Sequence, residues 1–253
     1  MLDFFTRPRD RIMGEILYRT EETRAVEQRL AKRKSFLLHG PTGVGKTLIL
    51  GCVVAKVPAL VYCQNAASSQ EMFRGIAQGL LHGGASRIRQ ACRNDEGIRS
   101  KSAVALKGIV MDALREGSFS IVLDHVSQPS QSFATAVREI MGWCSTPVIA
   151  VARSIHMEDA GFLQPLYSDR HDRYELKNFD AATAGRFIHE MAERQKLSAS
   201  NMSEFLSKVL DFSEGNPAAI LSMLRMSTLA KYRSQEHIKI SPLYIDFRMN
   251  RSH

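Results

Sequence analysis

The sequence predicts an α/β fold, in which helices cover a parallel sheet on both faces and a small all-helical subdomain follows. Two observations lead to this prediction. Up to about residue 178, short apolar runs of strand length alternate with longer amphipathic segments, an order typical of parallel sheets. After residue 179, three helical patterns follow one another with no strand between them. We therefore expect a domain over residues 1–178, a helical subdomain over 179–233 and a tail of unassigned role over 234–253.

The first domain is expected to begin with a helix over residues 20–33, which has Val26 and Leu30 on one face. Apolar runs predict strands at residues 35–39, 59–63, 119–123 and 147–153, and "DRYELKNF" is a candidate for a fifth, short strand. Helices are expected to start at Lys46 and to cover residues 68–81, 101–117 and 131–145, with Ser68 or Ser69 as an N-cap. The polar stretch over residues 82–97 predicts a loop or a poorly ordered insert.

The stretch "FLLHGPTGVGKTLIL" contains the full pattern G-x-x-x-x-G-K-[ST], in which Gly40, Gly45, Lys46 and Thr47 are the specified residues. A strand that enters a glycine-rich turn opening a helix directs backbone N–H groups and the helix dipole toward polyphosphate. Lys46 would reach the β- and γ-phosphates, and the Thr47 hydroxyl would bind Mg²⁺. We therefore expect a nucleoside triphosphate to be bound by Gly40, Pro41, Thr42, Gly43, Val44, Gly45, Lys46, Thr47 and Leu48.

A second informative stretch is "FSIVLDHV", an apolar run that ends in Asp124. An acid at the carboxyl end of a buried strand, in the same sheet as a phosphate loop, stands where a Mg²⁺-holding carboxylate is needed. We therefore expect Asp124 to be a magnesium ligand together with Thr47.

The helical subdomain is predicted from "DAATAGRFIHEMAERQ", "SASNMSEFLSKVLDFSEG" and "NPAAILSMLRMSTLAKYR". Asp180, Ser198 and Asn216 are candidate N-caps of these helices. Beyond them, "LYIDF" could form one more strand or a docking tail.

Taken together, these stretches resemble the ATPase module of the AAA+ superfamily of P-loop NTPases, and most closely its STAND branch of signal-transduction ATPases with their short archaeal and bacterial relatives. The resemblance rests on "ILYRTEETRAVEQRL" with Arg19 in the family's arginine position, on "GPTGVGKT", on "IVLDHV" followed by "VIAVARS", and on "SEGNPAAI". The last resembles the G-x-P element at the start of a lid helix. The four stretches span about residues 12–232.

The resemblance implies ATP and Mg²⁺ as ligands and a lid that packs over the nucleotide. It places Pro217 against adenine, Arg153 at the γ-phosphate and Asp124 at Mg²⁺. The family's second acid, which activates the attacking water, is here His125, so the resemblance implies ATP hydrolysis that is slow or assisted by another residue. His156, Glu158 and Asp159 are open alternatives for that base.

Charge, hydropathy and cysteine content limit which partners and which compartment the sequence predicts. The net charge is +8, and basic residues concentrate before the phosphate loop, in "SRIRQACR" and near the C-terminus, so nucleic acid is an open partner alongside a protein partner or a second copy. No apolar run reaches the roughly 18 residues that a membrane span needs. Four scattered cysteines indicate a reduced, cytoplasmic protein without a zinc framework.

The sequence thus predicts an ATP-binding and ATP-hydrolysing molecular switch, whose lid closes on Mg·ATP to control its association with itself or with a partner. Two alternatives stay open at this point. One is a DNA-associated helper ATPase of the transposition or replication-loading type, and the other is a degenerate ATPase that only binds the nucleotide.

Overall fold

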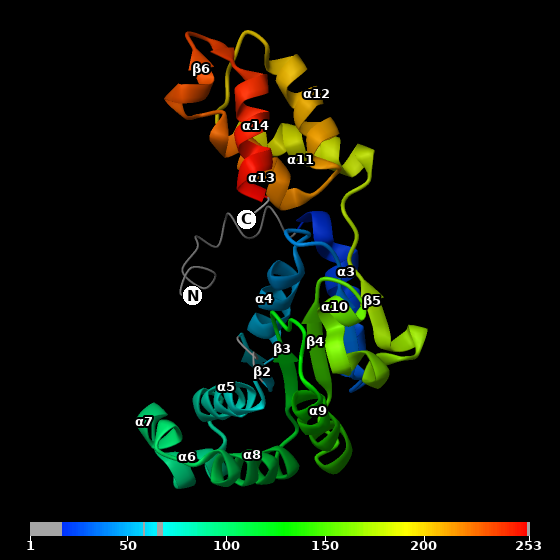
Figure 1. Cartoon of the computed structure of the whole chain (residues 1–253), viewed down its shortest axis with the longest axis vertical. Helices are drawn as coiled ribbons and strands as arrows, with labels where there is room; N and C mark the ends of the chain where they lie inside the picture. The colour runs from blue at the N-terminus through cyan, green and yellow to red at the C-terminus, as the bar shows by residue number, and fades with distance from the viewer. Residues whose placement is uncertain (1–16, 58, 65–67, 252–253) are drawn as a thin grey trace. The chain divides into compact units, whose positions relative to one another are not determined.

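The computed structural model describes residues 17–57, 59–64 and 68–251 (Figure 1). These residues form two compact units. Unit 1 contains the described residues up to Gly40 together with Lys46–Leu176. Unit 2 contains Pro41–Gly45 and the described residues from Lys177 onward. The middle of the phosphate loop is therefore grouped with the C-terminal helices.

Unit 1 is built on a five-stranded sheet in the order β2-β3-β4-β1-β5, in which every neighbouring pair is parallel. The strands are β1 (Phe36–His39), β2 (Leu60–Cys63), β3 (Ser120–Leu123), β4 (Val148–Ala152) and β5 (Arg173–Glu175). All residues of β3 and β4 are buried, which explains their uninterrupted apolar runs. All five strands predicted from the sequence, including the short fifth one, are confirmed.

Helices flank this sheet. They are α3 (Thr20–Ala31), α4 (Lys46–Lys56), α5 (Ser69–His82), α8 (Ala103–Glu116) and α9 (Gln131–Trp143), with the shorter α10 (Met157–Ala160), η1 (Leu17–Arg19), η2 (Gly161–Tyr167) and η3 (Arg170–Asp172). The hydroxyl of Ser68 accepts a hydrogen bond from the backbone N–H of Glu71, so Ser68 is the N-cap of α5. Helix α3 packs on α4, and α5 packs on β2 and α8. The α/β fold with a helix-flanked parallel sheet is confirmed.

The loop predicted over residues 82–97 is wrong, because this stretch forms helices α6 (Ser86–Cys92) and α7 (Asp95–Arg99) (Figure 1). Ile88, Cys92 and Ile98 are buried, and α6 and α7 pack against α5. The stretch carries few apolar residues, so its helical pattern is weak in the sequence. Tertiary contacts stabilise helices too short to form alone.

Unit 2 is mainly helical, with α11 (Ala181–Arg194), α12 (Met202–Ser213), α13 (Pro217–Met226), η4 (Ala230–Tyr232) and α14 (Ile240–Arg251). It also contains a short antiparallel pair, β6 (Arg233–Ser234) and β7 (His237–Ile238). Asp180 and Asn216 cap α11 and α13 as predicted. Ser198 does not cap α12, which begins after Asn201.

Of the two alternatives for "LYIDF", a strand or a docking tail, the strand is wrong, since these residues belong to α14. Leu243 and Phe247 are buried against α12 and α13, and Tyr244 stacks on Phe212 with ring centroids 3.7 Å apart. Apolar residues spaced by four form one face of a helix. Helix α14 is therefore part of the packed core of unit 2.

Candidate nucleotide-binding site

The phosphate loop joins the end of β1 to the start of α4, as its sequence pattern requires. Gly43 and Gly45 have φ values of 82° and 108°, a backbone region that residues with a Cβ adopt only with strain. The N–H of Gly40 donates to the carbonyl oxygen of Arg153 over 3.1 Å, which anchors the start of the loop to the end of β4. The glycines of the motif therefore allow a turn that other residues would strain.

Lys46 is the first residue of α4, and its ammonium group lies over the start of the loop. The Nζ donates a hydrogen bond of 2.6 Å to the carbonyl oxygen of Gly40. Burial lowers the pKa of Lys46 below its ordinary value, and the nearby charge of Asp124 partly opposes this shift. A partly desolvated ammonium at a helix N-terminus is suited to bind phosphate oxygens.

Asp124 follows β3 directly and is buried, with an exposed fraction of 1 %. Its Oδ2 accepts a hydrogen bond of 3.1 Å from the Thr47 hydroxyl and another from the Tyr62 hydroxyl. Its Oδ1 accepts a hydrogen bond of 2.8 Å from the backbone N–H of His125. Three donors therefore hold this carboxylate beside the first turn of α4.

Tyr62, on the edge strand β2, is a site residue that the sequence analysis did not identify. Burial raises the pKa of Tyr62 well above its ordinary value, and the charge of Asp124 raises it further. The phenol therefore stays protonated and donates a hydrogen bond to the carboxylate. The register pairs Tyr62 with Val122 of β3, so only the strand order brings its hydroxyl to Asp124.

His125 has a left-handed backbone with a φ of 55°, and 60 % of its side chain is exposed. Its Nε2 lies 3.7 Å from Asp124 Oδ2. The imidazole of His125 thus lies beside the Asp124 carboxylate and faces solvent.

The loop after β4 contributes further charges near Lys46. Arg153 lies in this loop and is exposed, and its charge lowers the pKa of Lys46, whereas the charge of Asp159 raises it. Of the three open alternatives for a base, Asp159 is the one whose charge reaches Lys46. His39, at the end of β1, also lies in this group, and its pKa is lowered mainly by burial. His39 is the second site residue that sequence reasoning missed.

Within unit 2, the first turn of α13 contacts the loop segment Pro41–Gly45. Asn216 is buried, and its Nδ2 donates to the carbonyl oxygen of Thr42 over 3.0 Å. The N–H of Ala218 donates to the carbonyl oxygen of Gly43 over 3.2 Å. Pro217 is half-buried and occupies the first position of α13, where its missing N–H costs nothing. The loop and the predicted lid helix are thus joined by hydrogen bonds.

No protein-family model matches the chain. A curated relative, the ATP-dependent zinc metalloprotease FtsH of Aster yellows witches'-broom phytoplasma, is 26% identical over 205 residues. That match covers 77% of this chain and 28% of the relative, so the chain spans less than a third of that protein.

Two solved structures share the fold. A Walker-type ATPase of Pyrococcus abyssi superposes with a TM-score of 0.57 at 18% identity, over 83% of this chain and 67% of that one. The ORC1 protein of Aeropyrum pernix, solved in complex with DNA, gives 0.63 at 15% identity, over 92% of this chain and 65% of that one. These likenesses show that the chain has the P-loop ATPase fold with an added helical subdomain. Among the described residues, no helix combines the length and the apolar character needed to cross a bilayer.

Proposed function

We propose that this protein binds Mg·ATP at the loop between Gly40 and Thr47, hydrolyses it slowly, and acts as a nucleotide-dependent switch of the AAA+ type, in its STAND-like branch. The observation that carries the proposal is the contact between the Thr47 hydroxyl and the Asp124 carboxylate, 3.1 Å apart. A hydroxyl and a carboxylate that meet beside a phosphate loop are the pair of oxygen ligands that such a site requires.

The donor set fits magnesium rather than a softer metal. Thr47 and Asp124 supply oxygen ligands, and Mg²⁺ takes one or two protein oxygens together with phosphate oxygens and waters. When bound, the ion would neutralise charge on the β- and γ-phosphates. Tyr62 and the N–H of His125 would keep the Asp124 carboxylate oriented while it binds.

Hydrolysis needs a group that orients or deprotonates the attacking water. His125 and Asp159 are the candidates that the geometry favours, since His125 lies beside Asp124 and the charge of Asp159 reaches Lys46. His125 is largely solvated, so it is held loosely, which agrees with slow turnover. Lys46 and Arg153 would stabilise the charge that develops on the γ-phosphate.

The proposed switch depends on contacts that the protein makes with ATP and not with ADP. Lys46 and Arg153 would interact with a γ-phosphate that ADP lacks, so ATP would favour a closed arrangement more strongly. We propose residues 1–178 as the nucleotide-binding domain and 179–233 as the lid, with Pro217 against adenine. Support comes from the hydrogen bonds that join Thr42 and Gly43 to the start of α13, because these make the helix responsive to the shape of the loop.

The binding test is calorimetry of Mg·ATP with the wild type, Lys46→Ala and the control Lys56→Ala. Lys56 lies at the end of the same helix, where its ammonium pairs with Glu27 on the surface. We expect binding by the wild type and by Lys56→Ala, and at least 100-fold weaker binding by Lys46→Ala. Absence of heat from folded wild type at millimolar Mg·ATP would refute the proposal.

The rate of phosphate release from ATP distinguishes an ATPase from a protein that only binds ATP. We expect the wild type to exceed the Lys46→Ala background, and His125→Ala and Asp159→Asn to show which residue serves the water. Turnover no higher than that background would leave a binding module. Hydrogen exchange of α11–α13 with a non-hydrolysable ATP analogue and with ADP tests the switch, since equal protection would contradict it.

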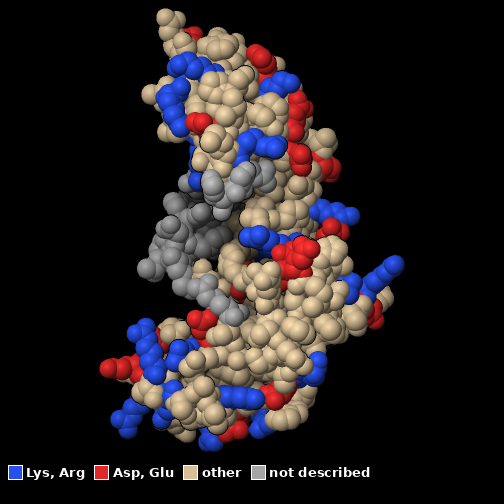
Figure 2. All heavy atoms as spheres, in the orientation of Figure 1, with Lys and Arg blue, Asp and Glu red and all other residues tan. Residues whose placement is uncertain are grey.

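A helper ATPase that acts on DNA is the second candidate function. The observation that favours it is the set of exposed cations on α6 and α7, where Figure 2 shows Lys and Arg gathered at the lower left of the view. Filter binding to DNA at low and moderate salt, with and without ATP, tests this candidate. Retention that does not fall with salt would count against it.

A further inference from the structure

A pocket between helix α5, the end of strand β2 and helix α7 lies outside the phosphate loop. Its volume is about 770 Å³, a size suited to an organic ligand rather than to an ion. The lining includes polar side chains that could recognise a ligand, namely those of Gln64, Glu71, Arg74, Gln78 and Arg99.

The architecture of the sheet explains why the pocket exists. β2 is the edge strand, with β3 on one side only. Helix α5 lies close to β2 because it presents Gly75 and Gly79 to it, and a Cβ on Gly79 would come within 2.6 Å of Val61 Cγ1. Helix α7 packs against α5, and residues of both helices line the pocket beside the end of β2.

The two arginines of this pocket form no ion pair with another described residue. The Nε of Arg74 is buried and has no hydrogen-bond partner among the described residues. A buried N–H without a partner is costly, which points to a ligand that satisfies it. Arg99 is exposed, and no ion pair joins it to another described residue. Glu71 is the acidic side chain of the lining, so the cations of Arg74 and Arg99 outnumber it.

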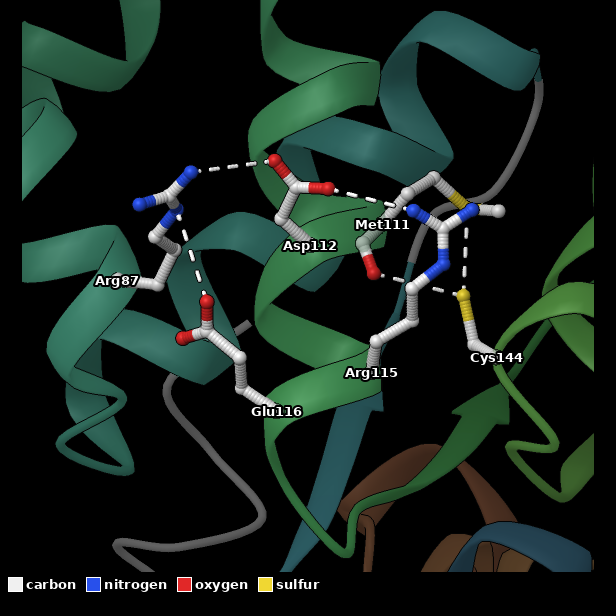
Figure 3. Close-up of polar contacts among 6 residues, drawn as sticks. All are labelled: Arg87, Met111, Asp112, Arg115, Glu116 and Cys144. Carbon is white, nitrogen blue, oxygen red and sulfur yellow. Dashed lines mark hydrogen bonds and ion pairs between the residues drawn. The ribbon is translucent and has the colours of Figure 1, made fainter.

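A neighbouring arginine shows the contrast. Arg87 of α6 lies 3.3 Å from Asp112 and 3.9 Å from Glu116 of α8, and Arg115 lies 3.3 Å from the other oxygen of Asp112 (Figure 3). The two ion pairs of Arg87 join α6 to α8, so Arg87 has a structural role. Arg74 and Arg99 have no such carboxylates and remain available to an anion.

We infer that this pocket binds a nucleotide unit through its phosphate group, either as a free nucleoside monophosphate or as part of a single strand. Guanidinium groups bind phosphate oxygens in a bidentate manner, so Arg74 and Arg99 supply the anion contacts. The amides of Gln64 and Gln78 offer donors and acceptors to a base or a sugar.

The experiment is fluorescence anisotropy with labelled dT10 and with labelled AMP, in EDTA and without ATP. The proteins are the wild type, Arg74→Gln, Arg99→Gln and the control Arg93→Gln, which removes the same charge from an exposed residue outside the pocket. We expect Arg74→Gln and Arg99→Gln to weaken binding at least fivefold, and Arg93→Gln less than twofold. Binding of dT10 alone identifies a strand as the source, and binding of AMP identifies a free nucleotide.

Equal weakening by Arg93→Gln would overturn the inference, because it would indicate a diffuse charge effect. Absence of binding by either probe at millimolar concentration and low salt would overturn it too. Lys46→Ala separates the two sites: it should retain probe binding, and loss of binding there would place the probe at the phosphate loop. Should Arg74→Gln fail to fold, exposed Arg99 carries the test, with Arg99→Lys expected to recover part of the affinity.

The two proposals can fail separately. If the wild type does not bind Mg·ATP but Arg74→Gln still weakens probe binding, the pocket is established and only the ATPase proposal is refuted.

Discussion

Asn216 links the phosphate loop to helix α13, and its substitution offers a graded test of that link. Its Oδ1 accepts a hydrogen bond of 3.1 Å from the N–H of Ala219 and so caps the helix. Its Nδ2 donates to the Thr42 carbonyl over 3.0 Å and to Asn178 Oδ1 over 3.2 Å. One buried side chain thus performs a capping role and a tethering role.

The two roles differ in size and can be separated. Loss of an N-cap costs about 1 kcal/mol, and each lost hydrogen bond costs about 1 kcal/mol more. Asn216→Ala should therefore destabilise unit 2 by about 2 to 3 kcal/mol. Asn216→Ser keeps a capping hydroxyl but cannot donate to both Thr42 and Asn178, so it should lose about 1 to 2 kcal/mol.

The assay is urea unfolding combined with hydrogen exchange of the α13 amides, because a chain of two units does not have to unfold in one step. Calorimetry of Mg·ATP on the same proteins tests the effect on the loop. We expect Asn216→Ser to bind about tenfold more weakly, since 1.4 kcal/mol corresponds to a factor of ten.

Asn201→Ser is the matched control. Asn201 makes two hydrogen bonds to the backbone of Ile238 at 2.9 and 3.0 Å in the same unit, and neither involves the loop. It should lower stability to a similar extent and leave ATP affinity unchanged. If Asn216→Ser unfolds within 0.5 kcal/mol of the wild type and binds ATP equally well, the tether contributes nothing and our reasoning fails.

Three further predictions follow from the same geometry. In urea unfolding, Gly43→Ala should destabilise the protein by about 1 to 3 kcal/mol, because the φ of Gly43 is 82° and an added Cβ would lie 2.7 Å from the Cβ of Ala218. The control Gly142→Ala should be neutral or stabilising, because the space around Gly142 is open. Burial lowers the pKa of Lys46, which means that the charged ammonium destabilises the folded protein. Lys46→Met should therefore leave the ligand-free protein at least as stable as the wild type. Unfolding of this variant at a lower urea concentration would contradict the prediction. Burial raises the pKa of Tyr62, so above about pH 10 the unfolded chain loses a proton that the folded chain keeps. The free energy of unfolding should therefore fall as pH rises, by up to about 1.4 kcal/mol per pH unit. Tyr62→Phe should reduce that slope, and an unchanged slope would show that Tyr62 does not cause it.

Most of the candidate site follows patterns that are local in the sequence. The phosphate loop is one continuous stretch, and the strands are apolar runs, so their existence could be predicted from adjacent residues. Asp124 could be predicted because strand ends in a parallel sheet share an edge, and the structure brings its carboxylate to Thr47. That these residues bind Mg·ATP stays a prediction.

Other features could not be predicted because they depend on packing between distant segments. The polar stretch around α6 and α7 is helical since three buried side chains are covered by α5 and neighbouring elements, and "LYIDF" is helical since Leu243 and Phe247 find partners in α12 and α13. Neither set of contacts can be read from local propensity, which is weak in both segments.

The sequence by itself thus determined the α/β architecture and the phosphate loop, because periodicity and a contiguous motif are properties of neighbouring residues. Only the tertiary structure decided that Tyr62 holds Asp124, that Asn216 bonds to the loop and that Arg74 lies in a pocket. Residues 62 and 124 are far apart in the chain, and so are residues 42 and 216. Their contacts arise from strand order and helix packing, which no local pattern encodes.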